Sequence, residues 1–410
     1  MSRLLIVLAG AAFLAGCHAD GERAPEMRWW KGNTHTHTLW SDGDAAPEAV
    51  VAWYREHGYQ FLALSDHNVL QEGERWFPVA ADGKGRLNPA ELEGLIQRFG
   101  ADAVTVREVD GRREMRLLAL DELRARFETP GEFVLITGEE ITAGFRDAGE
   151  PPRDHPVHVN ALNIAACLPA PAGDSIVDVM NRAVDAVVQE GEATGRPVLA
   201  HVNHPNFGWG LTWRDLAQVR GGRFFEVLNG HRGVANHGDA THPGTEEMWD
   251  RALVLRLTEL ALDPLYALAT DDAHNYFGKD TAQPGRGWVM VRAPELSAAA
   301  IIAAMRHGDF YASSGVTLSD VTRGDREYRV AIHVEEDVSY TTRFVGTRRT
   351  AEGIGPVGEV FLETDTNPAV YRYRGDELYV RAVVVSSRDH PNPFAAGDKE
   401  MAWTQPAAGR

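Results

Sequence analysis

The stretch THTHTLWSDG, residues 34–43, places two histidines one residue apart and follows them with a small acidic turn. Side chains at positions i and i+2 of a β-strand point to the same face, so His35 and His37 can share one metal ion. Two polar residues on the solvent-facing side of a strand would have the same spacing. Whether the pair belongs to a metal site therefore depends on what the other strand ends supply.

Six more apolar runs resemble the first, and each carries His, Asp or Glu in its polar portion. The seven runs are WWKGNTHTH (29–37), YQFLALSDHN (59–68), FVLITGEEIT (133–142), VHVNALNI (157–164), RPVLAHVNHPN (196–206), RFFEVLNG (223–230) and LYALATDDAHN (265–275). The alternation with helical segments predicts βα units around a parallel sheet. The polar residues are then expected at the carboxyl ends of the strands, where loops converge.

Two of the intervening segments have an apolar repeat typical of helices. They span residues 175–190 and 47–57. Ser175 is predicted to cap the start of the first helix, and Gly58 the end of the second.

The length of 410 residues predicts two domains, because single cores stop growing at roughly 250–300 residues. We expect an α/β domain over residues 28–315, with an insertion at about 71–132 that interrupts the alternation. Residues 316–410 change to strict alternation of apolar and polar residues, as in EYRVAIHVEED. This tail predicts a smaller β-rich domain, of a size that suits a β-sandwich.

Residues 1–17, MSRLLIVLAGAAFLAGC, have the pattern of an export signal that is too short to span a bilayer. The tetrad that ends in Cys17 resembles a bacterial lipobox, which implies a lipidated Cys17 and an anchor in the cell envelope. Asp20 does not follow Cys17 directly, so we expect the outer membrane, facing the periplasm. The other cysteine, Cys167, is predicted to be a small core residue.

The net charge of −18 disfavours a nucleic acid polymer as partner, because such binding draws on clustered Lys and Arg. Bound divalent cations would offset part of this charge locally. Hydrophobic residues at 44% and charged residues at 24% are ordinary for a globular protein, so the composition does not indicate disorder.

At four strand ends, neighbouring residues compete for one role as metal ligand. The competing pairs are Glu139 or Glu140, His158 or His155, His204 or His201, and Asp272 or Asp271. We prefer His204, because the following proline fixes the turn, and keep His201 as a reserve ligand or a supporting donor. His67 follows an apolar strand and is a strong candidate, whereas Asp42 equally suits a turn. Without a metal site, each of these residues would need a separate structural role at its own strand end. One shared metal site explains all of them together and is therefore favoured.

The ordered motifs H-x-H, S-D-G, S-D-H, G-E-E, V-H, N-H-P and D-x-H resemble those of the PHP (polymerase and histidinol phosphatase) metallohydrolases over about residues 28–315. The resemblance implies a distorted (β/α)7 barrel with a three-metal centre. The stretches FEVLNGH, MWDRAL, TDDAHNYFG, PGRGWVMV and GDFYASSGV are similar to the branch that includes the carbaryl hydrolase (CehA/McbA-like) proteins.

The resemblance also implies three sets of metal ligands. One metal would be held by His35, His37, Glu139 and Asp272, a second by the bridging Glu139 with His158 and His204, and a third by Asp42, His67 and His274. The histidinol phosphatase pattern has a histidine in place of Asp42, so a two-metal enzyme stays open.

Imidazoles mixed with carboxylates and no thiolate suit Zn, Mn or Fe. Such a centre predicts hydrolysis by a metal-bound hydroxide. His231, His201 or a metal-bound water are candidates for the acid that protonates the leaving group. The arginines Arg232 and Arg286 are candidates for contacts to phosphate.

The close of strand 223–230 supplies Glu226 and Asn229, which we interpret as residues that support the ligands or contact the substrate. The favoured function is a phosphoesterase that acts on a small phosphomonoester or diester. The competing functions are hydrolysis of carbamates or carboxylic esters, and a non-catalytic role as an envelope protein that uses metals for binding.

Overall fold

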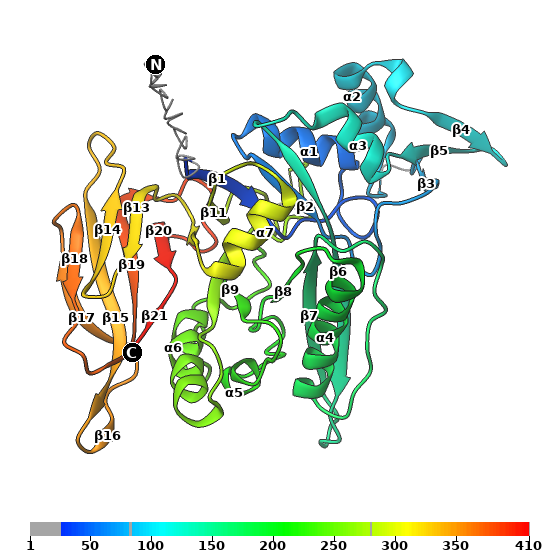
Figure 1. Ribbon diagram of the computed structural model, residues 1–410. Coiled ribbons are helices and arrows are strands. Elements are labelled where there is room, and N and C mark those ends of the chain that lie inside the picture. Colours follow the sequence, from blue (N-terminus) through cyan, green and yellow to red (C-terminus); the bar gives the residue numbers. More distant parts are fainter. Residues whose placement is uncertain (1–25, 82–83, 279–280, 410) are drawn as a thin grey trace, which may run out of the picture.

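The computed structural model describes residues 26–81, 84–278 and 281–409, so the predicted signal and Cys17 lie outside it. Figure 1 shows a mixed α/β part beside a part made of strands. One sheet of 15 strands runs through both. Among the described residues, no helix has the length and apolar character needed to cross a membrane.

Seven strands carry the polar ends predicted from the sequence. They are β1 (Arg28–Asn33), β2 (Phe61–Leu64), β6 (Val134–Arg146), β7 (Asp154–Leu162), β8 (Leu199–Val202), β9 (Phe224–Asn229) and β10 (Tyr266–Thr270). Their order in the sheet is β10-β9-β8-β7-β6-β2-β1. The strands β2, β9 and β10 are buried along their whole length, as expected where both faces of a sheet are covered.

The direction of β7 departs from the predicted parallel sheet. The pairs β1 with β2, β2 with β6, β8 with β9 and β9 with β10 are parallel. In contrast, β7 runs antiparallel to both β6 and β8. Only residues 147–153 connect β6 to β7, and a parallel pair would need a longer crossover.

The predicted (β/α)7 barrel is not confirmed, because the described sheet is open. Within the sheet β10 pairs with β9 and not with β1. The two strands meet only beyond their ends, through a bridge between Thr36 and Ala273. There Asp272 N donates to His35 O at 3.0 Å. The first and last of the seven strands therefore still bring their carboxyl ends together.

Helices cover this part of the sheet. They are α1 (Pro47–Glu56), α4 (Ile176–Thr194), α5 (Trp213–Ala217), α6 (Thr245–Leu255), which continues as a π-helical turn (Arg256–Leu260), and α7 (Ala298–His307). Both predicted caps are confirmed. Ser175 Oγ accepts from Asp178 N at 3.1 Å at the start of α4, and Gly58 follows α1 with a φ of +74°, which glycine adopts without strain.

A small unit of its own lies between β2 and β6, at the upper right of Figure 1. It consists of β3 (Arg75–Pro78), α2 (Pro89–Phe99), a 3-10 turn (Ala101–Ala103), β4 (Val106–Val109), β5 (Arg112–Leu117) and α3 (Leu120–Phe127). Its apolar side chains share a core with α1 and with Leu39 and Trp40. Trp40 Nε1 also donates to Leu118 O at 3.0 Å. The unit therefore supports the loop that follows β1.

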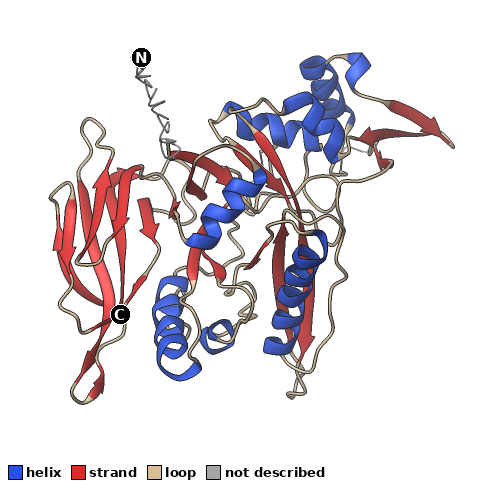
Figure 2. Ribbon diagram, viewed as in Figure 1, coloured by secondary structure: helices blue, strands red, loops and turns tan. Residues whose placement is uncertain are grey.

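The strands β11 (Trp288–Ala293) and β12 (Phe310–Ser313) continue the sheet from β1 into the strand-rich part. The remaining strands are β13 (Leu318–Arg323), β14 (Glu327–Ile332), β15 (Tyr340–Thr350), β16 (Gly353–Ile354), β17 (Glu359–Thr364), β18 (Ala369–Arg372), β19 (Glu377–Asp389), β20 (Lys399–Thr404) and β21 (Ala407–Ala408). The sheet β13-β14-β18 packs on β15, β19 and β20 around a core that includes Tyr328, Phe344 and Ala382. Figure 2 shows this arrangement of two facing sheets.

Candidate metal centre

Nine ionisable side chains from six strands, or from the loops that follow them, gather at one place. They are His35 and His37 after β1, Asp42 in the loop that follows, His67 after β2, Glu140 in β6, His158 in β7, His204 after β8, and Asp272 and His274 after β10. They form four overlapping groups in which the ligand atoms all lie within 4.8 Å of one another. Eight of them are the ligands that the sequence favoured, and the ninth, Glu140, was the alternative to Glu139.

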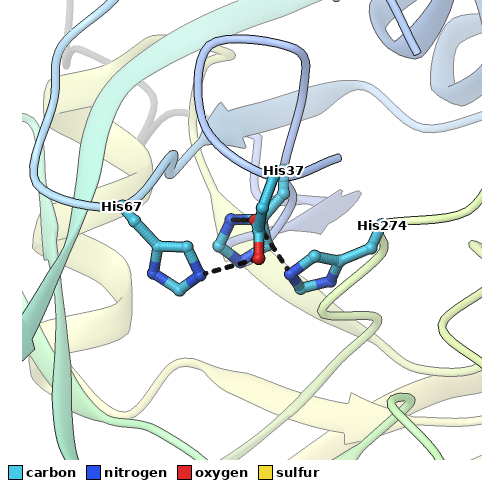
Figure 3. Close-up of side chains that lie close together, drawn as sticks. His37, His67 and His274 are labelled. Atoms are coloured by element: carbon cyan, nitrogen blue, oxygen red, sulfur yellow. Dashed lines mark ion pairs between the residues drawn. The ribbon is translucent and has the colours of Figure 1, made fainter. Parts of the chain in front are cut away.

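Four of these side chains, three of them partly exposed and one buried, are called here the outer group. They are His37, Asp42, His67 and His274. Figure 3 shows the three imidazoles turned toward one another. The Nε2 atoms of His67 and His274 lie 3.5 Å and 3.2 Å from the carboxylate of Asp42. Because the side chain of Asp42 is 54% exposed, a cation in this group would be open to solvent.

The inner group consists of His35, His204 and Asp272. All three are buried. His35 Nε2 lies 3.2 Å from Asp272 Oδ1, and the rings of His35 and His204 are 5.8 Å apart. His204 and Asp272 have positive φ angles of 21° and 48°, which residues other than glycine seldom adopt. The backbone is therefore bent at two strand ends to bring these side chains together.

Glu140 lies between the two groups and reaches both. Its Oε1 is 2.9 Å from His158 Nδ1 and 3.2 Å from His204 Nε2. Its Oε2 is 2.8 Å from His67 Nδ1 and 3.4 Å from His37 Nε2. A carboxylate whose two oxygens face different imidazole sets is placed to bridge two cations.

The assignment of Glu139 as the bridging carboxylate is corrected by this geometry. Neighbouring residues on a strand point to opposite faces, and Glu139 faces away from the imidazoles. Its Oε1 accepts from Leu168 N at 2.6 Å, and its Oε2 accepts from Cys167 Sγ at 2.8 Å. Cys167 is itself exposed, contrary to the prediction that it is a core residue.

The residues that competed with His158, His204 and Asp272 for a ligand role lie elsewhere. His155 pairs with Asp147 at 3.0 Å near the hairpin end of β7, away from the cluster. His201 is fully buried, and its Nδ1 lies 3.8 Å from Glu226. Asp271 accepts from Tyr54 and from the backbone N of Arg286, and so supports the loop after β10. The structure thus brings His158, His204 and Asp272 into the cluster rather than these neighbours.

Two imidazole nitrogens at the centre lack hydrogen-bond partners. His35 Nε2 and His37 Nε2 are buried and unpartnered, while Glu140 Oε2 has the imidazole of His67 at 2.8 Å. In neutral His35 the proton is on Nδ1, which lies 2.6 Å from Glu226 Oε1, so the lone pair of Nε2 faces Asp272 and Glu140. Acceptors that face acceptors in a buried site need positive charge between them. The donor set of imidazoles and carboxylates therefore fits divalent cations.

The pKa shifts have the same cause. Burial opposes ionisation of Glu140 and Asp272, but nearby imidazoles, chiefly His158 and His35, hold the pKa of both carboxyls well below its ordinary value. Burial lowers the pKa of His37 to about 4, with repulsion from His274 adding to the effect. Against the effect of burial, the same carboxylates raise the pKa values of four other ligand imidazoles, so without a cation these rings hold protons that a bound cation would replace; they are His35, His67, His204 and His274.

The residues proposed for proton transfer and phosphate contact occupy different places. The ring of His231 lies 5.6 Å from that of His274 at the edge of the cluster. Arg232 follows it with an exposed side chain. Arg286 is instead buried and donates to the carbonyls of Gly230 and Thr281, so it holds loops together. His201 is completely buried, and its ring lies 6.2 Å from that of His35.

Sequence reasoning missed two residues that support the ligands. Asn203 donates to Glu140 Oε1 at 2.8 Å, and Thr142 Oγ1 lies 2.5 Å from His67 Nδ1. Both occur within the seven runs, directly before His204 and two residues after Glu140. Each is a polar residue inside an apolar run, close to a residue that is itself a metal-ligand candidate. This pattern would have identified both residues.

No family model matches this sequence, and no curated protein sequence matches it either. Among solved structures, the chain is similar to a two-domain protein from Bacteroides vulgatus that contains a predicted PHP-like metal-dependent phosphoesterase. The identity is 16% and the TM-score 0.41, with 93% of this chain and 96% of that chain covered.

Two further similar structures cover 62% of this chain. One is an amidohydrolase from Chromobacterium violaceum with bound sulfate and no metal, at 17% identity, a TM-score of 0.30 and 90% of its own length. The other is a proposed metal-dependent phosphoesterase from Bifidobacterium adolescentis, at 15% identity, a TM-score of 0.29 and 92% of its length. Likeness at this level carries no functional argument, so the function has to follow from the site.

Proposed function

We propose that this protein is a metal-dependent hydrolase of the PHP type that uses two or three divalent cations, Zn, Mn or Fe. The observation that carries the proposal is the position of Glu140, whose two oxygens face imidazoles of both groups. Bound cations supply Lewis-acid stabilisation of the charge that grows on the attacked centre, and they make a bound water more acidic. The family assignment is supported by the order of the motifs along the chain.

His231 is the proposed proton donor to the leaving group. Its Nδ1 accepts from Gly233 N at 2.9 Å, so the proton of the neutral ring is on Nε2. Burial lowers the pKa of His231, which makes the neutral form and its Nε2 proton the relevant state at neutral pH. Since His201 is completely buried and His231 is partly exposed beside His274, His231 is the better placed of the two candidate acids.

The proposed substrate is a small phosphomonoester or diester. A solvent-facing group with an exposed carboxylate at its rim supports a small substrate that enters from the side of Asp42. Arg232 is the proposed contact to the phosphate, because its side chain is exposed next to His231.

A hydrolase of carbamates or carboxylic esters is the second candidate. It is favoured by the burial of Arg286, which leaves fewer cationic side chains for a phosphate than the sequence suggested. It is also the activity that the resemblance to the carbaryl hydrolase branch implies.

A panel of esters tests these proposals. The full chain is loaded with Zn, Mn or Fe and assayed against a phosphomonoester, a phosphodiester, a carboxylic ester and a carbamate. We expect turnover of a phosphate ester that falls more than about 100-fold in Glu140→Gln but stays near that of the wild type in Glu139→Gln. Turnover of the carbamate alone would support the second candidate. Bound metal without turnover of any ester would leave the non-catalytic binding protein.

We also propose that the protein is exported and anchored in the outer membrane through a lipidated Cys17. The support is the sequence of residues 1–17 alone. Membrane fractionation of cells that express the full chain tests it. We expect the wild type in the membrane fraction and Cys17→Ser outside it, and a wild type that fractionates with soluble proteins would contradict the anchor.

A further inference from the structure

Glu226 is a buried carboxylate in β9 that receives four hydrogen bonds. Its Oε1 accepts from Thr270 Oγ1 at 2.8 Å and from His35 Nδ1 at 2.6 Å. Its Oε2 accepts from His204 N at 2.7 Å and from Asn229 Nδ2 at 2.8 Å. The residue is completely buried, so every one of these donors is part of the protein interior.

Three of the four contacts lead to members of the inner group. The contact to His35 Nδ1 sets the tautomer of that ring and leaves the lone pair of Nε2 for a cation. The contact to His204 N holds the backbone where φ is 21°. Asn229 connects Glu226 to Asp272, since its Nδ2 also donates to Asp272 Oδ2 at 3.1 Å.

We propose that Glu226 is a positioning residue that orients all three ligands of the inner group and thereby sets the affinity of that group for its cation. It touches neither the cation nor the substrate. The proposal rests on the proposed metal-dependent function. The specific prediction is that Glu226 changes the affinity for the cation of the inner group and not the affinity for the other cations.

The outer group is held by other residues. Asp66 accepts from Thr38 N at 2.8 Å and from Ser41 Oγ at 2.6 Å, and so orders the loop that carries Asp42. His67 Nδ1 lies 2.5 Å from Thr142 Oγ1. Among the described residues, the hydrogen bonds and ion pairs of Glu226 reach no member of the outer group. Loss of Glu226 should therefore leave the outer cation largely unchanged.

The substitution Glu226→Gln gives a sharp test, because it keeps the size and removes the charge. A glutamine has one acceptor oxygen, so its amide N–H groups would face two of the four donors. Metal-free protein is titrated with Zn or Mn in a calorimeter, and bound metal is counted by elemental analysis. We expect one cation to bind about 10- to 100-fold more weakly, with the others unchanged.

Glu139→Gln is the matched control, because it also neutralises a buried glutamate beside the cluster, and the hydrogen bonds of this side chain within the described residues come from Leu168 N and Cys167 Sγ. It should change no cation affinity. Asp42→Asn, which removes a carboxylate from the outer group alone, identifies which binding step belongs to that group. The step that Glu226→Gln weakens must be a different one.

A merely structural role predicts another outcome. All cations would then bind more weakly together, and the unfolding temperature of the metal-free variant would fall below that of Glu139→Gln. Either result would overturn the proposal. If Glu226→Gln does not fold, Asn229→Ser tests the link to Asp272, and it should weaken the same cation by a smaller factor. An unchanged affinity there also overturns it.

Failure of the proposed function is distinguishable from failure of this inference. A wild-type protein that binds cations but hydrolyses no ester removes the proposed function and leaves the positioning role measurable by titration. A wild-type protein that binds no divalent cation removes both.

Discussion

Two buried ionic clusters in this molecule differ in one respect. At the junction of α6 with β19, Asp250 accepts from Arg381 Nε at 2.8 Å, from Arg381 Nη2 at 2.7 Å and from Tyr379 OH at 2.8 Å. Both oxygens of that carboxylate thus have donors. In the metal centre, by contrast, the buried His35 Nε2 and His37 Nε2 have no hydrogen-bond partner and face the carboxylate of Asp272.

The difference separates a structural cluster from a functional one. A buried ion pair with all its partners joins two elements of the fold, although it adds little net stability compared with apolar packing. A buried cluster whose acceptors face one another is complete only when positive charge arrives from outside. The arrangement of partners, rather than the number of charges, therefore indicates where the chemistry is.

Removal of divalent cations should have the largest effect, and it should act on the metal centre and not on the ion pair of Asp250 with Arg381. Treatment with a chelator is expected to abolish ester hydrolysis, because the carboxylates and imidazoles of the centre then face one another without cations. It should also lower the unfolding temperature, since a cation at 100 times its Kd contributes about 2.7 kcal/mol per site.

Calorimetric scans with and without the chelator measure this change, and added Zn or Mn should reverse it. The Glu140→Gln variant serves as control, since its unfolding temperature should respond less to cations. Equal responses in wild type and variant would contradict the assignment of Glu140 to the centre.

The substitution Arg381→Met should have the next largest effect, this time on stability. It leaves the buried carboxylate of Asp250 with Tyr379 as its remaining donor, and loss of one partner of a buried ion pair costs about 3–5 kcal/mol. Denaturant unfolding of the cation-loaded protein measures the change. Metal affinity should stay that of the wild type.

Arg343→Met is the control for this prediction. Arg343 pairs with Glu363 at 2.6 Å, but both side chains are about half exposed, so the cost should be within about 1 kcal/mol. Equal losses of unfolding free energy in Arg381→Met and Arg343→Met would show that the buried ion pair stabilises the fold no more than the exposed one.

The substitution Asp42→Asn should have a smaller, partial effect on the centre. The exposed Asp42 is the carboxylate of the outer group, while Glu140 and the inner group remain intact. We expect the number of bound cations to fall by one and the rate of ester hydrolysis to fall about 10- to 100-fold. Elemental analysis and the kinetic assay measure the two changes. An unchanged cation count would mean that the outer group is not a metal site.

The smallest effect is expected at Glu377 in the strand-rich part. Burial raises the pKa of this carboxyl, but hydrogen bonds from Arg374 N and from Tyr371 OH outweigh it and lower the pKa to about 2. A depressed carboxyl pKa contributes stability above the ordinary value near 4.5, and this stability is lost as the pH falls toward 2.

The wild type should therefore lose unfolding free energy relative to Glu377→Gln as the pH falls from about 5 to about 3. Urea unfolding at several pH values measures it. A difference that stays constant across this range would contradict the shift.

Much of the candidate centre could be predicted from the chain. The spacing of His35 with His37 predicted that the two share a face, and both do lie with Glu140, although His35 belongs to the inner group and His37 to the outer group. Asp272 and His274 also follow one strand and are divided between the same two groups. The start of α4 was predictable because Ser175 is a local cap. These predictions succeeded because each rests on interactions between residues close in sequence.

The choice between Glu139 and Glu140 was not predictable in this way. β6 is buried on both faces over residues 135–141, so hydrophobicity does not mark which side is inward. The antiparallel direction of β7, in contrast, was predictable from the sequence. The connection at residues 147–153 is too short for the crossover helix that a parallel pair needs.

The sequence by itself determined which residue types stand at the strand ends and in what order, because these are local properties of each motif. Only the tertiary structure decided that Glu140 faces the imidazoles, that Arg286 is internal and that Glu226 reaches the inner group. The physical reason is that strand pairing sets the face on which each side chain lies. The partners of a buried charge come from strands far apart in the sequence, and their distances exist only once the sheet has formed.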